Sequence, residues 1–291
     1  MANLITIGIP AYNRKEALLH VLADLVRQGV HQMPGIEVLV IDDASPDDTY
    51  SAALPYHGMG GIRVLRNETR QGFRGNFGKL IAHCETEYLM YSCDDDFVLG
   101  AGIAQLHAHL AAETAPPALL SSLYYEKGEV YRANPDRIEE IGLGEYRNCC
   151  AHLPGVVFNA RLARSVWSRI EHFMLDPRNV YPQCCLALVM LLFGYRGMYY
   201  PVELVRTGFD LESGIVAYAT VGERWKQFLF FHDLLEHLAA HIQDDAVQAR
   251  ARQLLEQHKL SLFRTLGNGV SVEKPELAAY FLQGARQHLG A

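Results

Sequence analysis

Tyr88-Leu89-Met90-Tyr91-Ser92-Cys93-Asp94-Asp95-Asp96 is an apolar run that ends in three consecutive carboxylates. Three adjacent aspartates repel one another, so a nearby positive charge is needed to hold them at the end of a buried strand. A divalent cation such as Mg²⁺ or Mn²⁺ would serve, because these ions prefer oxygen ligands and bridge to phosphates. The alternative is a solvated acidic turn that caps the following helix. The sequence on either side of the run has to separate the two interpretations.

Short apolar segments alternate with helical patterns on the N-terminal side of this run. The expected strands cover residues 4–9, 36–41, 62–65 and 87–92, and the expected helices cover residues 15–28 and 73–84. This order predicts an α/β fold with a mostly parallel central sheet flanked by helices.

Polar residues follow three of the expected strands, at the point where each strand ends. They are Tyr12-Asn13-Arg14, Asp42-Asp43 and Asp94-Asp95-Asp96. Ligands of parallel sheets bind beyond the carboxyl ends of the strands. Because three such ends converge on one edge of the sheet, we predict a binding site there.

The second half of the chain predicts further strands and then mainly helices. Strands are expected at residues 119–125, 130–131, 156–158 and 198–205, and helices at residues 101–112, 161–173, 183–193, 215–266 and 275–289. No Pro/Ser-rich hinge separates these segments. We therefore expect one α/β domain over residues 1–210 and a helical C-terminal extension over residues 211–291.

Composition excludes several classes of function. The 291 residues carry a formal net charge of -7, which gives no electrostatic footprint for nucleic acid. The longest apolar run, residues 184–193, is far shorter than the roughly 18–20 residues that cross a bilayer. The N-terminus has no signal-peptide pattern, and none of the six cysteines forms a CxxC pair. We expect a cytoplasmic protein with buried thiols, and peripheral contact with the inner face of the plasma membrane stays open.

Three motifs in order carry a resemblance to a known family. They are Pro10-Ala11-Tyr12-Asn13-Arg14, Val40-Ile41-Asp42-Asp43-Ala44-Ser45-Pro46-Asp47-Asp48-Thr49, and the aspartate cluster after a hydrophobic strand. Together they resemble the nucleotide-sugar half of a family 2 glycosyltransferase, which implies the GT-A fold. Gly72-Phe73-Arg74-Gly75-Asn76 followed by the three aspartates is similar to bacterial polysaccharide and O-antigen transferases, abequosyltransferase-like members among them. The resemblance assigns residues 1–100 to the donor half and leaves residues 101–210 for the acceptor.

The resemblance implies a set of donor-binding residues. The set is Pro10, Ala11, Tyr12, Asn13, Asp43, Arg70, Arg74, Asn76 and Asp94. The Tyr12 ring offers a face on which a nucleobase stacks, and Asp43 would accept a hydrogen bond from that base. Arg70 and Arg74 flank a glycine-containing helix start, which suits a diphosphate. A solvated basic face is the other interpretation of these arginines, and Asp42 is expected to be a structural turn residue.

The resemblance also implies a cation, either Mn²⁺ or Mg²⁺, at the aspartate run. Cys93 falls where relatives often have the first aspartate of an Asp-x-Asp motif. Asp95 is then the main metal ligand, Asp96 a further ligand, and Asp94 lies near the ribose. An alternative register uses Asp94 and Asp96 as the ligand pair.

The implied reaction is attack of an acceptor hydroxyl on the anomeric carbon of a nucleotide sugar. Inversion, which the resemblance implies, requires a general base on the opposite face of the sugar. Many relatives carry an acidic pair near the position of Gln183, and this chain has none there. Asp176 is our candidate for the catalytic base, with His152 and Asp210 in reserve.

Other functions and partners stay open at this point. The acidic pair is missing, and Cys93 stands at the first position of the metal motif. A catalytically inactive nucleotide- or glycan-binding protein is therefore an alternative. A nucleotidylyltransferase would need a glycine-rich basic loop after the first strand, which is absent. The expected acceptor is a glycan or a lipid-linked saccharide. Arg161, Arg164 and Arg169 would suit an anionic lipid or a solvated helix face, and aromatic residues after position 224 would suit a core or a homodimer.

Overall fold

A computed structural model of the chain describes residues 4–126, 129–130, 135–208 and 221–265. The strands are β1 (Ile5–Ala11), β2 (Ile36–Asp42), β3 (Ile62–Arg66), β4 (Tyr88–Tyr91), β5 (Asp96–Val98), β6 (Leu119–Glu126), β7 (Glu129–Val130), β8 (Glu139–Glu140), β9 (Val156–Asn159) and β10 (Gly197–Thr207). The α-helices are α1 (Lys15–Arg27), α2 (Thr49–Ala53), α3 (Gly72–His83), α4 (Gly100–Ala112), α5 (Ala160–Arg169), α6 (Glu171–Met174), α7 (Pro182–Leu192), α8 (Val221–His241) and α9 (Asp245–Thr265).

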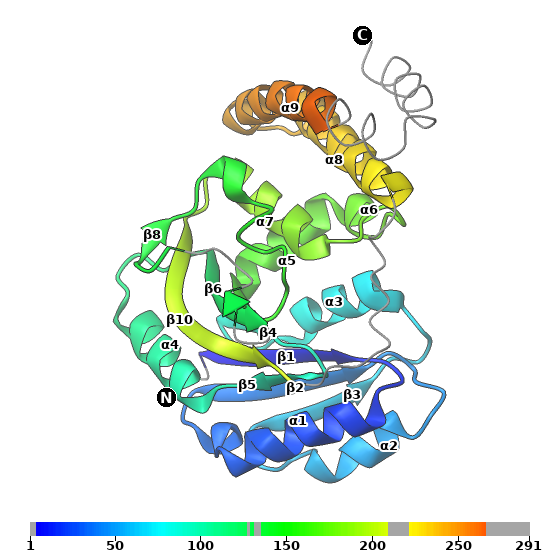
Figure 1. Ribbon diagram of the computed structural model, residues 1–291, viewed down its shortest axis with the longest axis vertical. Helices are drawn as coiled ribbons and strands as arrows, with labels where there is room; N and C mark the ends of the chain where they lie inside the picture. The colour runs from blue at the N-terminus through cyan, green and yellow to red at the C-terminus, as the bar shows by residue number, and fades with distance from the viewer. Residues whose placement is uncertain (1–3, 127–128, 131–134, 209–220, 266–291) are drawn as a thin grey trace. The chain divides into compact units, whose positions relative to one another are not determined.

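One mixed sheet runs in the order β3-β2-β1-β4-β9-β6-β10-β5, with β7 on β6 and β8 on β10 (Figure 1). Strands β1 to β4 pair in parallel, as the sequence predicts, so the ends of β1, β2 and β4 meet at one edge. Beyond β4 the sheet becomes mixed, because β9 is antiparallel to both β4 and β6. The convergence of three strand ends on one edge is therefore confirmed.

Helices cover both faces of the parallel strands (Figure 1). Helix α1 buries Leu18, Leu22 and Leu25 against the sheet, which is the stripe that its apolar spacing predicts. Helix α3 lies on the opposite face, where Phe77 stacks on Tyr91 of β4 with the ring centroids 4.4 Å apart. The Tyr91 hydroxyl donates a hydrogen bond to the Phe77 carbonyl at 2.9 Å. This pairing holds the middle of α3 close to the end of β4.

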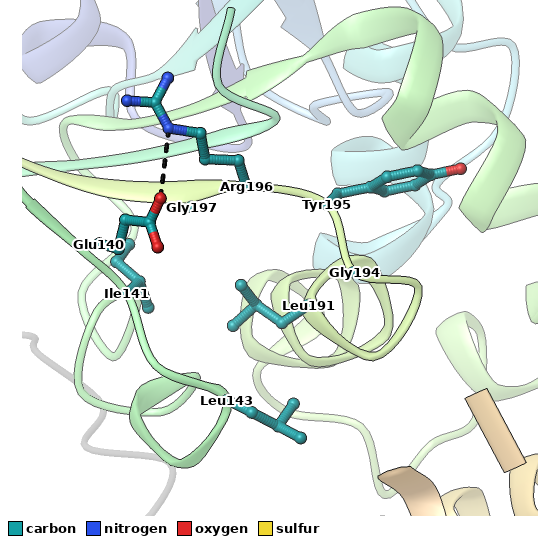
Figure 2. Close-up of a pocket in the computed structure, with 8 residues that line it drawn as sticks. All are labelled: Glu140, Ile141, Leu143, Leu191, Gly194, Tyr195, Arg196 and Gly197. Carbon is teal, nitrogen blue, oxygen red and sulfur yellow. Dashed lines mark ion pairs between the residues drawn. The ribbon is translucent and has the colours of Figure 1, made fainter. Parts of the chain in front are cut away.

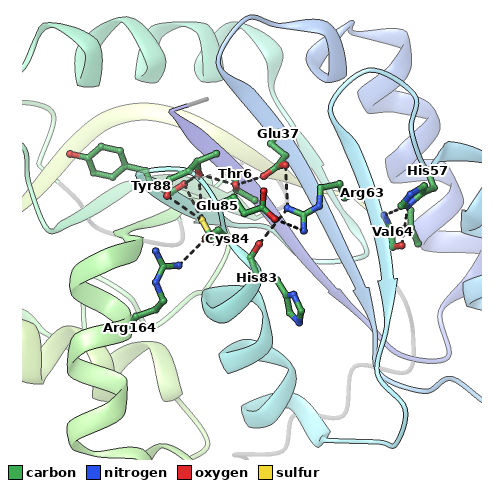
Figure 3. Close-up of polar contacts among 11 residues, drawn as sticks. Thr6, Glu37, His57, Arg63, Val64, His83, Cys84, Glu85, Tyr88 and Arg164 are labelled. Atoms are coloured by element: carbon green, nitrogen blue, oxygen red, sulfur yellow. Dashed lines mark hydrogen bonds and ion pairs between the residues drawn. The ribbon is translucent and has the colours of Figure 1, made fainter. Parts of the chain in front are cut away.

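A polar network fastens the opposite, amino-terminal edge of the same strands (Figure 3). The buried Thr6 hydroxyl donates to Glu37 at 2.9 Å, and Arg63 pairs with Glu37 at 3.3 Å and with Glu85 at 3.0 Å. Arg164 donates to the carbonyls of residues 81 and 84, where α3 ends. The network fixes the strand register. Arg164 is exposed, and its guanidinium also connects α5 to the end of α3, while contact with an anionic lipid stays a prediction.

The structure differs from the expected elements in several places. Within the described residues, the helix expected over residues 215–266 is divided into α8 and α9, and β8 was not expected. The helix expected over residues 161–173 is divided at Ile170, which has a non-helical φ of -128°. Strand β5 was not expected, and it begins at Asp96, the last residue of the aspartate run. It pairs with the end of β10, Asp96 lying opposite Thr207. The helix expected over residues 275–289 lies outside the described residues.

The chain divides into two compact units. The first contains the sheet and runs to Asp176, then resumes at Tyr181. The second contains Pro177–Val180 with α8 and α9, and within it Arg178 pairs with Asp233 at 2.6 Å. All six cysteines are free, and five of them are buried. None of the helices that the structure describes is long and apolar enough to cross a membrane.

Candidate functional site

The turns that follow β1 and β2 are fastened to each other. Each contains a non-glycine residue with positive φ, Asn13 at 54° and Ala44 at 56°. The Asn13 N–H donates to Ser45 Oγ at 2.9 Å, and the Ser45 N–H and hydroxyl both donate to Asp42. Asp42 is the last residue of β2, and its carboxylate has the structural role in the following turn that was predicted. These hydrogen bonds hold the ends of β1 and β2 in fixed relative positions.

Asp43, the predicted contact to a nucleobase, accepts hydrogen bonds from the start of α3. Its Oδ1 accepts from the Gln71 N–H at 2.7 Å and from Asn67 at 2.8 Å, and its Oδ2 accepts from the Gly72 N–H at 2.8 Å. A carboxylate has about four acceptor positions, so these bonds leave room for one more on Oδ2. Asp43 therefore orients the loop that carries Arg70, and its contact with a base stays a prediction.

Asn76, another predicted donor-site residue, makes hydrogen bonds within the protein. It is buried, and its amide donates to the Ile41 carbonyl at 3.0 Å while its oxygen accepts from Asn67 at 3.2 Å. These contacts attach α3 to the end of β2. A direct role in donor binding stays a prediction.

The Tyr12 ring lies at the site edge with a guanidinium on its face. Arg70 Cζ is 4.0 Å from the ring centroid, a cation–π geometry. Arg70 itself is exposed, and Arg74 is partly buried in the first turn of α3. Pro10 and Ala11 belong to β1, where they pair with β2. An aromatic face and a basic group are thereby brought together beside the turn at Asn13.

The three aspartates point in different directions because the chain turns sharply there. The Asp96 N–H donates to the Cys93 carbonyl at 3.4 Å, and β5 begins at the same residue. The turn gathers Cys93, Asp95 and Asp96, whose potential ligand atoms all lie within 4.8 Å of one another. Asp94 is hydrogen-bonded to the backbone of Tyr12 instead. The grouping brings Asp95 and Asp96 together with Cys93, and the assignment of the metal ligands among the three aspartates stays a prediction.

The surroundings of Cys93, Asp94 and Asp96 disfavour the negatively charged forms of these side chains. Burial, and next the charge of Asp95, raise the pKa of Asp94 to about 7. The same two causes raise the pKa of Asp96 to about 7, although hydrogen bonding with Gly208 opposes the shift. Burial, followed by the carboxylates, raises the pKa of the Cys93 thiol well above its usual value. The cluster therefore favours either bound protons or a cation.

Two carboxylates and a thiol within this distance fit a divalent cation. Asp95 and Asp96 supply the hard oxygen ligands that Mn²⁺ and Mg²⁺ prefer, and Cys93 adds a softer donor. The residue types and their spacing thus agree with the cation that the sequence predicts.

Sequence reasoning did not assign roles to two residues that shape this cluster. Arg14 Nη1 lies 2.5 Å from Asp95 Oδ2, although Arg14 was noted only as part of the first motif. Gly208 approaches so closely that a Cβ there would lie 2.1 Å from the Asp95 carbonyl oxygen. The position of Arg14 directly after β1 could have indicated a contact with the aspartates, because the ends of β1 and β4 meet at one edge of the sheet. No local pattern points to Gly208.

Asp176 follows α6 in the first compact unit, and its N–H donates to the Phe173 carbonyl at 3.2 Å. Burial, and next Cys184, raise the pKa of the Cys185 thiol of α7 well above its usual value, and the charge of Asp176 adds to this shift. His152 precedes β9 and is partly exposed, and Asp210 lies outside the described residues. The role of Asp176 as the base stays a prediction.

A pocket of about 240 Å³ lies at the start of β10, at the other end of this strand from Thr207 (Figure 2). Its Arg196 pairs with Glu140 at 3.6 Å and with Glu113 at 3.3 Å. Because the single guanidinium of Arg196 is already paired with two carboxylates, the pocket offers little attraction to an anionic ligand.

Comparisons with known proteins were made for sequence and for fold. No curated protein matches the chain significantly in sequence. Among solved structures, TarS 1–349 of S. aureus in complex with UDP-GlcNAc is similar, with a TM-score of 0.68 and 15% identity over 93% of this chain and 76% of that chain. Mannosyltransferase PcManGT of Pyrobaculum calidifontis, in complex with GDP-Man and Mn²⁺, has a TM-score of 0.54 and 17% identity over 99% of this chain and 88% of that one.

At these identities the likeness concerns the fold, and it agrees with the GT-A fold predicted from the sequence. The family model described as glycosyl transferase family 2 matches residues 6–166, more than half of the chain. This match includes all three strand ends and the aspartate cluster. The chain is a glycosyltransferase that belongs to glycosyl transferase family 2.

Proposed function

We propose that this enzyme transfers a sugar from a nucleotide-sugar donor to an acceptor hydroxyl, with a divalent cation held by Asp95 and Asp96. The observation that carries the proposal is the meeting of Tyr12, Arg70 and the Cys93–Asp95–Asp96 group at one edge of the sheet. An aromatic face, a basic group and a cation site are the three features that a nucleoside diphosphate requires. The nucleotide sugars bound to TarS and PcManGT, and the Mn²⁺ of PcManGT, support the same assignment.

In this proposal each residue of the site has a separate role. Tyr12 stacks on the base, Asp43 accepts a hydrogen bond from it, and Arg70 with Arg74 contacts the diphosphate. Asp95 and Asp96 would hold a cation, which would supply positive charge to stabilise the departing diphosphate. Asp176 accepts the proton of the acceptor hydroxyl, which attacks the anomeric carbon with inversion.

The finer parts of the proposal rest on the motifs. Residues 1–100 bind the donor, residues 101–210 bind a glycan or lipid-linked saccharide, and residues 211–291 form the extension. The likeness of Gly72–Asn76 and the aspartates to O-antigen transferases supports a role in bacterial cell-surface polysaccharide assembly.

The first test is thermal stability with UDP, GDP, CMP, CDP, dTDP or ATP, each with Mn²⁺, Mg²⁺ or EDTA. A native-state ligand raises the melting temperature, so one nucleoside diphosphate should stabilise the chain only with metal. Release of that diphosphate from its sugar nucleotides then measures turnover. Asp95→Ala should abolish metal-dependent turnover without unfolding, whereas Glu68→Ala, an exposed acid after β3, should not.

Two outcomes would contradict the proposal. Full activity in a folded Asp95→Ala protein would remove Asp95 from the metal site. Metal-dependent nucleotide binding without turnover, for every sugar nucleotide and acceptor class offered, would favour the inactive binding protein.

A further inference from the structure

Cys93 differs from every other cysteine of the chain in its surroundings. The other five are buried, whereas Cys93 is partly exposed. Cys93 directly follows Ser92, whose N–H donates to the Gly8 carbonyl at 2.9 Å as β4 comes to its end. The thiol is therefore delivered to the ligand-binding edge of the sheet and not to the apolar core.

The same turn that places Cys93 also places two carboxylates around it. Sulfur and carboxylate oxygens of Cys93, Asp95 and Asp96 lie within 4.8 Å of one another, and Asp96 is itself 5% exposed. The strand pairing of Asp96 with Thr207 and the close approach of Gly208 to Asp95 hold this turn from the other side. The turn at residues 93–96, with residues 207–208 packed against it, therefore presents one sulfur and two oxygen donors within a short distance of one another.

This donor set has a chemical preference. Mg²⁺ requires near-octahedral oxygen coordination, whereas Mn²⁺, Co²⁺ and Zn²⁺ accept increasingly soft ligands. Asp95 already pairs with Arg14, so a cation that uses only oxygen would depend mainly on Asp96. A sulfur ligand adds affinity for softer cations and little for Mg²⁺.

We propose that Cys93 is a third protein ligand of the cation and makes the site select sulfur-tolerant divalent cations over Mg²⁺. This inference rests on the proposed cation site. On binding, the S–H bond breaks, a metal–sulfur bond forms, and the proton passes to solvent without any change in oxidation state. The selectivity order is Mg²⁺ weakest, then Mn²⁺, with Co²⁺ and Zn²⁺ tightest.

The direct test is titration of the full chain with Co²⁺, followed by thiolate-to-metal charge-transfer absorption. The wild type and Cys84→Ser, a buried control at the opposite edge, should show the band. Cys93→Ser should lose it and bind Co²⁺ on the order of tenfold more weakly, with Mg²⁺ affinity little changed. An identical band in Cys93→Ser, or no band in the wild type, overturns the proposal.

A second measurement uses the unaltered protein and so does not depend on how a variant folds. Iodoacetamide reacts with the thiolate, so the raised pKa of Cys93 should make its alkylation slow. Partly exposed Cys93 should still react ahead of the buried cysteines, and Mn²⁺ should slow the reaction further, as followed by peptide mass spectrometry. Alkylation at the same rate with saturating Mn²⁺ contradicts a metal–sulfur bond.

These measurements can contradict the Cys93 proposal and the transferase proposal independently of each other. If Mn²⁺-dependent nucleotide binding occurs but Cys93 remains unprotected, the transferase assignment stands and the sulfur ligand is wrong. If Co²⁺ produces the band but no nucleotide binds, the metal ligand stands and the donor assignment is wrong.

Discussion

Arg14 Nη1 lies 2.5 Å from Asp95 Oδ2, so a guanidinium occupies one oxygen of the carboxylate that we propose as the main metal ligand. Arg14 lies in the turn between β1 and α1, Asp95 lies beyond β4, and the two strands are neighbours in the sheet. The positive charge of Arg14 also opposes the raised pKa of Asp94. The chain thus carries its own countercharge at the cluster, and a cation has to compete with it for Asp95.

Arg14→Gln tests this competition. Without the guanidinium, Mn²⁺ should bind more tightly by about 1 kcal/mol, or roughly fivefold in Kd, because a partly exposed ion pair contributes at most about this much. Calorimetric titration with Mn²⁺ measures the change. Arg66→Gln is the matched control, since Arg66 pairs with Asp42 on the same edge. Equal affinities in wild type and Arg14→Gln would show that no competition exists.

Asp43→Ala tests the role of Asp43 in orienting α3. Two backbone N–H groups and Asn67 lose their acceptor, so stability should fall by about 2 kcal/mol. Chemical denaturation measures this loss, and Asp48→Ala, at an exposed acid paired with Lys15, should change stability little. A stable Asp43→Ala protein with lost nucleotide binding would instead assign Asp43 to the base alone.

Tyr12→Ala tests base stacking. Loss of one stacked base should cost about 1–3 kcal/mol, which weakens nucleoside diphosphate binding roughly 5- to 150-fold. Tyr12→Phe should bind almost as the wild type does, because the ring is retained. Tyr50→Ala is the control, since its ring also carries an arginine, Arg66, at 5.3 Å. Unchanged binding in Tyr12→Ala would show that the base does not stack on Tyr12.

Asp176→Asn tests the proposed general base. Removal of a general base lowers kcat by about 10²- to 10⁴-fold, while donor binding should persist because Asp176 is not among the donor residues. Single-turnover assays with bound donor separate the two effects. Loss of turnover in His152→Gln with full turnover in Asp176→Asn would transfer the role to His152.

The raised pKa values of Asp94 and Asp96, both about 7, predict a pH dependence. Because these values exceed the unfolded value of 3.8, their contribution to stability is full below about pH 4 and is lost as the pH rises through about 7. Melting temperatures in EDTA should show this decline, and Asp96→Asn should reduce it. Protons compete with metal, so Mn²⁺ affinity should rise by up to about tenfold per pH unit for each proton displaced. The part of this rise that comes from Asp96 should end near pH 7, and displacement of the Cys93 thiol proton should extend the rise to higher pH, because the pKa of that thiol is raised. Affinity that does not change with pH would contradict this coupling.

Much of the donor half follows from the sequence alone. The apolar runs and helical spacing before residue 92 predicted β1 to β4, α1 and α3, each within a residue or two. These patterns are local, because the alternation of buried and exposed side chains is set by the period of a strand or helix. The parallel order then placed Tyr12, Asp43 and the aspartates at one edge, since parallel strands share a direction.

Other features depended on segments far apart in the chain. Strand β5 is only three residues long and exists because the end of β10 pairs with it, so no local pattern marked it. That pairing separates Asp96 and Asp95 from Asp94 and brings Cys93 into the cluster. The Arg14–Asp95 ion pair and the bonds from Gln71 and Gly72 to Asp43 likewise need side chains of different strands to meet. Sequence periodicity determined which segments are strands and helices and where each ends, whereas which polar atoms touch was decided by tertiary packing, because hydrogen bonds and ion pairs act only over a few ångströms.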